Sequence, residues 1–234
     1  MPKVAFSDCY VTIWRGEDCL SFLDGLSSNQ IINLKKNQVI QSSILDKNAK
    51  IIDFVTILHL GGFLAIVGHE NNFQSMLDFV TPKILQSDVS ITDISKLNDV
   101  VIIFDEENSV PMATCQTIDD VTYARIRRDM IYCIAGKKVN FGGDIMGDDF
   151  HEWRITNLIP WYEYEINSKS IPYSCGLNQY VHDSKGCYTG QEILTRMRTR
   201  NRGIKVLKNI PNSKLDKEKV TTKGREKSLV IVNQ

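Results

Sequence analysis

The sequence lacks any long apolar run. No stretch of its 234 residues approaches the roughly 20 consecutive apolar residues that a membrane-spanning helix needs. The first residues also lack the apolar stretch and the small-residue cleavage site of a secretory signal. Apolar residues make up 42% of the chain and charged residues 24%, as in an ordinary globular protein. We therefore expect a cytoplasmic protein that does not associate with a membrane.

Metal-ligand and disulfide patterns are also missing. The six cysteines, at positions 9, 19, 115, 133, 175 and 187, form no Cys-x-x-Cys pair, and no cysteine or histidine has zinc-finger spacing. A cytoplasmic location also disfavours structural disulfides. We therefore expect no bound metal ion, and we expect most of these cysteines to be small buried hydrophobes.

The formal net charge is zero, but the charges are unevenly distributed. Residues 1–184 contain 15 Lys and Arg against 24 Asp and Glu, whereas residues 185–234 contain 13 against 4. Such asymmetry is found in proteins that bind nucleic acids or acidic partners. It is also found where a basic face is simply solvated, which is the interpretation we favour.

Apolar periodicity predicts helices after Asp18, over residues 73–80 up to Pro82, and over residues 144–158 with Trp153 and Leu158 facing inward. Gly61-Gly62 separates two β-branched runs and predicts a hairpin. The other expected strands cover residues 4–13, 89–94, 100–104, 121–126 and 130–135. Helices mixed with hairpins indicate an α+β fold with antiparallel sheets.

The residue pattern changes at Gly203, after which alternating apolar residues and a last apolar run at 228–232 predict short strands. We therefore expect a main domain over 1–202 and a short β segment over 203–234, which is too small to bury its own core.

The most informative stretch is Lys-Gly-Cys-Tyr-Thr-Gly-Gln-Glu at residues 185–192. Thr189 and Glu192 have the spacing of a capping box, which predicts a helix that begins at Thr189. Cys187 then lies just before the positive end of a helix dipole, and Lys185 adds a full charge. Both effects favour the reactive thiolate. The alternative, an inert cysteine in a tight loop before a well-capped helix, stays open on the residues alone.

These eight residues resemble the signature of the YgfZ family of folate-binding proteins, which are relatives of the glycine-cleavage T-protein, an aminomethyltransferase. Segments at 22–29, 154–177 and 202–207 resemble the same family in the same order. Departures include Gln30 where an Asp is usual, and Arg125-Ile126-Arg127-Arg128 where the family has Asp-Pro-Arg. The C-terminal barrel of the family is cut here to about thirty residues after Gly203.

The resemblance implies intertwined α+β subdomains around a central folate channel, with a truncated C-terminal β appendage. It implies tetrahydrofolate or a derivative as ligand, and a role in assembly or repair of iron–sulfur enzymes, including those that modify transfer RNA. Iron–sulfur client or assembly proteins are then the expected partners of a chain that we expect to be monomeric.

The resemblance also assigns site residues. It places the functional centre at Cys187 and Lys185. It also places an acidic residue, Asp53, facing the folate. The alternative for Asp53 is an inward polar residue of a strand that backbone donors satisfy. Glu163 and Glu165 fall in the segment that contacts the pterin in relatives, or are solvated loop charges. The remaining expected folate contacts are Gly186, Tyr188, Gln191 and Arg196.

Two other functions compete. A folate-dependent aminomethyltransferase is favoured by Asp53 but disfavoured by the cysteine signature, because amine transfer to folate needs an acid or base and no thiol. We therefore predict no glycine-cleavage activity. An RNA-binding adaptor is suggested by the basic tail and by the arginines at 196, 198, 200 and 202. No aromatic residues alternate with these arginines, so nucleic-acid binding is the least favoured function.

Overall fold

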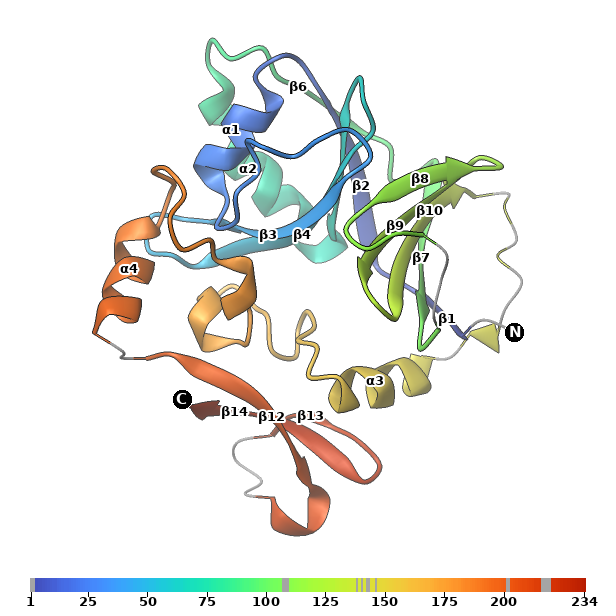
Figure 1. Cartoon of the computed structure of the whole chain (residues 1–234), viewed down its shortest axis with the longest axis vertical. Helices are drawn as coiled ribbons and strands as arrows, with labels where there is room; N and C mark the ends of the chain where they lie inside the picture. Colours follow the sequence, from blue (N-terminus) through green and yellow to red (C-terminus); the bar gives the residue numbers. More distant parts are fainter. Residues whose placement is uncertain are drawn as a thin grey trace.

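Three β-sheets and four α-helices make up the part of the chain that the structure describes. The computed structural model describes residues 3–106, 110–137, 139, 141, 144–145, 147–200, 203–215 and 220–234. Figure 1 shows two large sheets side by side, with the third sheet below them. The α-helices are α1 (Cys19–Leu26), α2 (Phe73–Ile84), α3 (Gly147–Thr156) and α4 (Gln191–Thr199). Short 3-10 turns cover Glu70–Asn72, Pro172–Ser174, Asn178–Tyr180 and Asn212–Lys214.

Two of the sheets are entirely antiparallel. The five-stranded sheet has the strand order β3 (Val39–Leu45), β4 (Ile51–His59), β5 (Leu64–His69), β2 (Cys9–Arg15) and β6 (Ser90–Asp93). The three-stranded sheet has the order β12 (Lys205–Pro211), β14 (Lys227–Asn233) and β13 (Val220–Lys223).

The six-stranded sheet contains one parallel pair. Its order is β11 (Asp144–Ile145), β1 (Lys3–Phe6), β7 (Asn98–Phe104), β10 (Met130–Gly136), β9 (Val121–Arg127) and β8 (Cys115–Ile118), with β1 and β11 parallel. The prediction of an α+β fold built on antiparallel sheets is confirmed.

The two large sheets are interlocked by the path of the chain. The expected single strand over residues 4–13 is wrong, because β1 belongs to the six-stranded sheet and β2 to the five-stranded sheet. The polar pair Ser7-Asp8 interrupts the run, and the Ser7 hydroxyl donates to Val100 O at 3.0 Å. The chain then completes the five-stranded sheet before it returns to the first sheet at β7.

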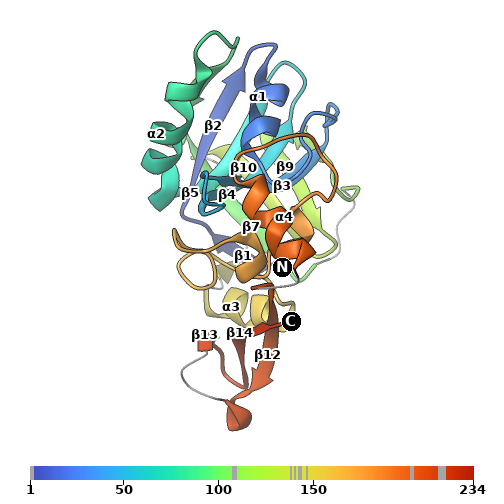
Figure 2. The same ribbon diagram turned by 90° about the vertical axis from the view of Figure 1, so that its left-hand side faces the viewer.

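The main core lies between these sheets. Val11, Leu58 and Val67 of one sheet pack with Ile102 and Tyr132 of the other in a single buried cluster. A second cluster covers the opposite face of the five-stranded sheet, where α1 and α2 pack. The three-stranded sheet lies beyond α3 (Figure 2), and α3 contacts β14.

The turn after α3 differs from the prediction. The helix ends at Thr156, and Leu158, which was expected to face inward, is 42% exposed. Its φ of +54° lies in the left-handed region, which residues other than Gly, Asn and Asp rarely adopt. The chain needs this conformation to turn from α3 into the segment at residues 159–162.

We expect Leu158→Asn to stabilise the protein by about 0.5–1 kcal/mol, because asparagine tolerates the left-handed region at lower cost. Leu158→Ala is the matched control, since alanine keeps the unfavourable conformation and loses the side-chain contacts. Urea unfolding of the two variants and the wild type measures the difference. An Asn variant that is no more stable than the Ala variant would contradict this account.

Candidate functional site: a two-part cavity and the Cys187 loop

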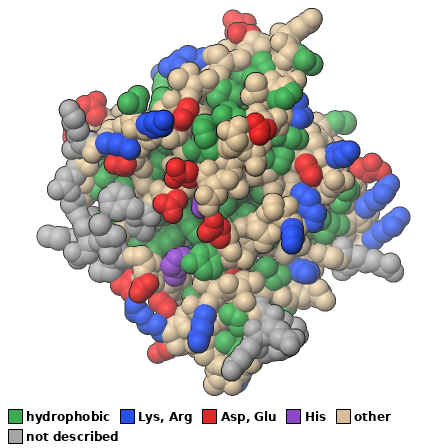
Figure 3. Space-filling view, turned by 180° about the vertical axis from the view of Figure 1, so that it is seen from behind, with side chains coloured by type: hydrophobic (Ala, Val, Ile, Leu, Met, Phe, Trp, Pro, Cys, Tyr) green, Lys and Arg blue, Asp and Glu red, His purple; other side chains and the backbone are tan. Residues whose placement is uncertain are grey.

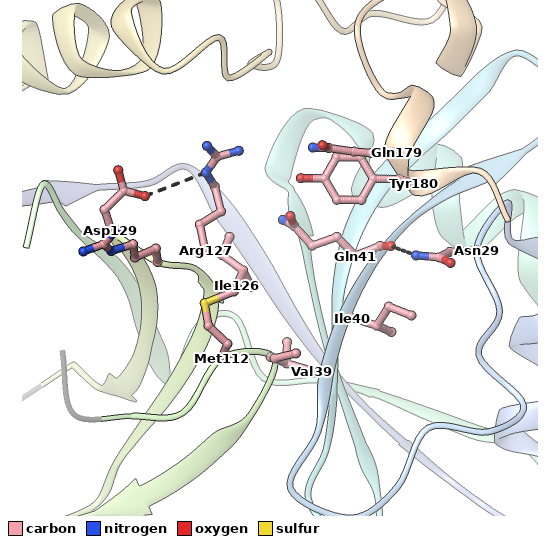
Figure 4. Close-up of a pocket in the computed structure, with 12 residues that line it drawn as sticks. Asn29, Val39, Ile40, Gln41, Met112, Ile126, Arg127, Asp129, Gln179 and Tyr180 are labelled. Atoms are coloured by element: carbon pink, nitrogen blue, oxygen red, sulfur yellow. Dashed lines mark hydrogen bonds and ion pairs between the residues drawn. The ribbon is translucent and has the colours of Figure 1, made fainter. Parts of the chain in front are cut away.

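An outer cavity of about 500 Å³ opens between β3 and the turn from β9 to β10. Figure 4 shows Ile40 and Gln41 on one side with Tyr180 above Gln41, and Met112 and Arg127 on the other side. The residues that line it are Asn29, Val39, Ile40, Gln41, Met112, Ala113, Ile126, Arg127, Arg128, Asp129, Gln179 and Tyr180. The volume lies within the usual range for a small-molecule site, about 300–1,000 Å³.

An inner cavity adjoins the outer one and is lined mostly by aromatic and aliphatic side chains. The residues that line it are Gln41, Phe54, Ile126, Arg127, Met130, Tyr132, Ile159, Pro160, Trp161, Tyr162, Leu177 and Tyr180. It has only about 20 Å³ of free space, enough for about one water molecule. Gln41, Ile126, Arg127 and Tyr180 line both cavities, and we call these four residues the throat.

Arg127 places a positive charge at the throat. Its side chain is 30% exposed, and its Nε lies 3.9 Å from Asp129 Oδ1, which is a weak ion pair. That buried Nε has no hydrogen-bond partner among the described residues. Burial raises the pKa of Tyr180, and hydrogen bonding to Gln179 and the nearby Arg127 oppose the rise. The throat is thus cationic in a part of the chain with an acidic composition.

Tyr162 supplies a polar atom at the inner end. Its buried hydroxyl makes no hydrogen bond of ordinary geometry within the described part of the chain, although it is near enough to Asp53 to help lower that carboxyl's pKa. The Tyr162 ring stacks on His69, with ring centroids 4.5 Å apart. The Tyr162 ring lines the inner cavity, while its hydroxyl interacts with Asp53.

Asp53 does not face the cavity as expected. The neighbouring Phe54 lines the inner cavity, and the Asp53 carboxylate lies behind the wall, fully buried. Its oxygens accept hydrogen bonds from the Tyr10 hydroxyl at 2.8 Å and from Asn72 Nδ2 at 2.9 Å. Gly68 is needed beside them, because a Cβ there would lie 2.1 Å from Asp53 Oδ2. The alternative interpretation, an inward strand residue satisfied by donors, fits Asp53.

Glu165 likewise makes its contacts within the protein and lines neither cavity. Its buried carboxylate forms an ion pair with Arg154 at 2.9 Å and accepts hydrogen bonds from Thr221 and Thr222 of β13. The expected pterin contact is therefore replaced by a link between α3 and the three-stranded sheet. Glu163 is exposed, has a φ of +64° and accepts a hydrogen bond from Asn71, so it is a loop charge.

The expected capping box is wrong. Gly190 is the N-cap residue of α4, and its φ of +84° and its close approach to Asp46 O explain the glycine. Thr189 lies one residue earlier and its backbone N–H donates to Gly25 O at 3.0 Å. Glu192 instead forms an exposed ion pair with Arg196. Thr189 therefore holds the loop against the end of α1 and does not cap α4.

Lys185 is buried, which also differs from the expectation of a free charge beside Cys187. Its Nζ donates to the carbonyl oxygens of Asp24, Ser27 and Asn29 at 2.6, 2.9 and 2.8 Å, and lies 3.2 Å from Asp24 Oδ1. These carbonyls use all three N–H donors of the ammonium group. Burial lowers the pKa of Lys185, and Asp24 opposes the shift. A cation at the C-terminal end of α1 also complements the helix dipole.

Cys187 is the exposed cysteine among the six. Burial raises the pKa of each of the other five, to about 12 for Cys9, Cys133 and Cys175. Cys187 does not line the outer or the inner cavity, so the two features occupy different places on the molecule.

The remaining expected contacts lie around this cysteine and outside both cavities. Gly186 is exposed, and Gln191 begins α4. Tyr188 packs near the Lys185 ammonium, and burial raises its pKa to about 12. Arg196 is exposed, and Lys and Arg side chains gather at the edge of the molecule where α4 lies (Figure 3). Arg202, part of the expected arginine series, lies outside the described residues.

The sequence-based expectation of a channel lined by the Asp53 region and the segment at 154–177 agrees with Phe54, Trp161 and Leu177 of the inner cavity. It missed Gln41, Arg127 and Tyr180. The aromatic density over residues 161–180 and the departure at Arg125–Arg128 were the available signals. No helix in the described ranges is long and apolar enough to cross a membrane. No group of three or more His, Cys, Asp or Glu among those residues is placed to hold a metal ion.

A structural relative accounts for the arrangement. The crystal structure of glycine cleavage system aminomethyltransferase T from Bartonella henselae matches with a TM-score of 0.80 over 99% of this chain and 79% of that chain. This chain has the aminomethyltransferase T fold. The sequence identity is 13%, so the likeness establishes the fold alone. No protein-family model and no curated protein sequence matches the chain.

Proposed function

We propose that this protein binds tetrahydrofolate or a derivative in the two-part cavity and acts as an accessory protein for iron–sulfur enzymes through the Cys187 loop. The observation that carries the first half is the aromatic inner cavity joined through a cationic throat to the outer cavity, in a fold shared with an aminomethyltransferase T. The sequence signature around Cys187 supports the second half.

The chemistry of the lining fits a folate. A pterin is a flat ring that stacks on aromatic side chains, and Phe54, Tyr132, Trp161 and Tyr162 surround the inner cavity. The Gln41 side chain, which lines both cavities, can meet a polar edge of that ring. The carboxylates of the folate tail suit Arg127 at the throat. Since the inner cavity holds only about one water molecule, ring entry requires the throat side chains to move.

Cys187 supplies the reactive group of this proposal. An exposed thiol can be oxidised reversibly, form a mixed disulfide with a partner or contribute a ligand to an iron–sulfur cluster. Cys187→Ser should leave the fold intact, because the loop is held by Lys185 and Thr189. We expect this variant to fail to restore iron–sulfur enzyme activity in cells that lack the protein, whereas Cys115→Ser, at a buried position, restores it. Full restoration by Cys187→Ser would rule out the thiol role.

A second candidate, aminomethyl transfer to folate, is favoured by the structural likeness. It is disfavoured by the lining, since none of the residues that line the inner cavity is acidic and Asp53 lies behind its wall. We expect no tetrahydrofolate-dependent turnover of an aminomethyl-lipoyl substrate. Turnover that Asp53→Ala abolishes would favour the transferase instead.

Ligand binding is tested by a tetrahydrofolate titration that follows tryptophan fluorescence, because Trp161 lines the inner cavity. The wild type should show a saturable change. Arg127→Gln should weaken binding by about ten-fold or more, as expected for loss of a hydrogen bond to a charged group. Arg196→Gln, a matched change at an exposed arginine, should bind like the wild type. The absence of saturable binding by the wild type would refute the folate proposal.

A further inference from the structure

Two segments that are far apart in the sequence are joined beside the cavity. The segment at residues 24–29 comprises the last residues of α1 and those that follow it, and the segment at residues 178–189 leads into α4. The Ser28 hydroxyl donates to Tyr180 O at 2.8 Å, and the His182 backbone N–H donates to Ser28 O at 2.9 Å. The hydroxyl and the carbonyl oxygen of Ser28 therefore both bind the segment at 178–189. We expect a displacement of one segment to displace the other.

Lys185 and Thr189 extend this junction to the Cys187 loop. The buried Lys185 ammonium binds three carbonyls of residues 24–29, and the Thr189 N–H binds a fourth, that of Gly25. Cys187 lies midway between these two anchors and is exposed. The loop that carries the thiol is thus fixed at both ends to one segment.

The same two segments form part of the cavity wall. Asn29 lines the outer cavity from the first segment, and Gln179 and Tyr180 line it from the second (Figure 4). Tyr180 also belongs to the throat, and its ring packs on Phe54 with centroids 4.9 Å apart. A ring that enters the inner cavity must displace Tyr180, because the free space there is about 20 Å³.

We infer that occupancy of the cavity is coupled to the conformation of the Cys187 loop, with Lys185 and Asp24 as the positioning residues that transmit the change. The two states are a closed throat and an open throat. A ligand that binds only the open throat shifts the 178–182 segment, and the Ser28 and Lys185 contacts carry the shift to the loop. The coupling is reciprocal, so modification of Cys187 changes ligand affinity by the same factor. The identity of the ligand, though not the junction, rests on the proposed function.

The test measures the rate at which iodoacetamide labels Cys187, followed by mass spectrometry, with and without saturating tetrahydrofolate. We expect saturation to slow labelling by about five-fold or more, the lower end of typical coupling between sites. The half-saturation concentration should equal that of the fluorescence titration. Methylthiolation of Cys187 should in turn weaken tetrahydrofolate binding, because the coupling is reciprocal.

Lys185→Met should remove the effect of the ligand on labelling while the fluorescence titration still reports binding. The double variant Asp24→Asn/Lys185→Met serves the same purpose if the single variant fails to fold, because it removes both charges. Arg196→Gln, which changes an exposed cation of α4, should keep the full effect. A purely structural role of Lys185 would alter stability without abolishing the ligand dependence of labelling.

A further variant makes the test independent of the ligand. Tyr180→Ala removes the throat side chain and should by itself change the labelling rate by a similar factor. If tetrahydrofolate binds and neither it nor Tyr180→Ala changes the labelling of Cys187, the coupling is refuted and the proposed function stands. If tetrahydrofolate does not bind, the proposed function is refuted and Tyr180→Ala alone decides whether the coupling exists.

Discussion

Replacing Arg154 with methionine is expected to lower the free energy of unfolding by about 3–5 kcal/mol. The guanidinium group is fully buried, and it pairs with Glu165 at 2.9 Å and donates to Thr222 Oγ1 at 2.6 Å and to His151 Nδ1 at 2.8 Å. Methionine fills the space of the aliphatic stem but leaves the Glu165 carboxylate buried without its cation. Urea unfolding followed by tryptophan fluorescence measures the loss.

The double variant Arg154→Met/Glu165→Gln separates the charge effect from packing. It removes both buried charges, so it should recover most of the stability that the single change loses. Arg225→Met is the matched control, because Arg225 is paired with Asp149 at the surface and should contribute less than about 1 kcal/mol. An Arg154→Met variant as stable as Arg225→Met would show that the buried pair does not hold the three-stranded sheet to α3.

The regular elements were predictable because local patterns determine them. The Gly61-Gly62 turn joins β4 to β5 as expected, and the apolar stripe over residues 73–80 falls within α2. Pro82 does not end that helix, which continues to Ile84. The alternating residues after Gly203 form β12, and the last apolar run forms β14. In each case the periodicity is long enough to outweigh other influences.

The missed strands show where local patterns are insufficient. β3 contains Gln41, Ser42 and Ser43, whose polar side chains break its apolar pattern. Both serines are nevertheless buried. The Ser43 hydroxyl has no hydrogen-bond partner among the described residues. The Ser42 hydroxyl accepts a hydrogen bond from the Asn29 N–H, and the Ser43 backbone N–H donates to Ser28 Oγ. These partners come from another part of the chain, so the strand is stabilised by tertiary contacts that the sequence does not display.

The exposure of Cys187 was predictable from the sequence, whereas the contacts of Lys185 and Asp53 were not. Cys187 is exposed, as expected for a thiol in a loop between two glycines, Gly186 and Gly190. The role of Lys185 depends on three carbonyls about 160 residues away in the sequence, which no local pattern identifies. Alternation along β4 requires Asp53 and Phe54 to face opposite sides, but it does not determine which of them lines the cavity.

The burial of Asp53 should make the free energy of unfolding depend on pH, because a buried carboxylate is less stable than a buried carboxylic acid. Burial raises the pKa of Asp53 from 3.8 to about 6, and the hydrogen bonds from Asn72, Tyr10 and the Phe54 N–H oppose the shift without cancelling it. The folded protein therefore holds this proton more tightly than the unfolded chain. The Asp53 contribution to stability falls as pH rises from about 4 to about 6, and the total change is about 3 kcal/mol.

We expect Asp53→Asn to remove this pH-dependent term, because the amide is neutral at every pH. Its oxygen can still accept from Asn72 and from the Phe54 N–H, while its NH₂ group can donate to the Tyr10 hydroxyl. Other carboxyl groups titrate in the same range, so the informative quantity is the difference between the unfolding free energies of the wild type and the variant from pH 4 to pH 8. That difference should move in favour of the variant as pH rises to about 6 and then remain constant. Asp53→Ala is the control, since it leaves these three donors without their acceptor and should destabilise the protein at every pH. A difference between wild type and Asn variant that does not change with pH would mean that Asp53 is ionised in the folded protein throughout this range, and that polar neighbours offset its burial.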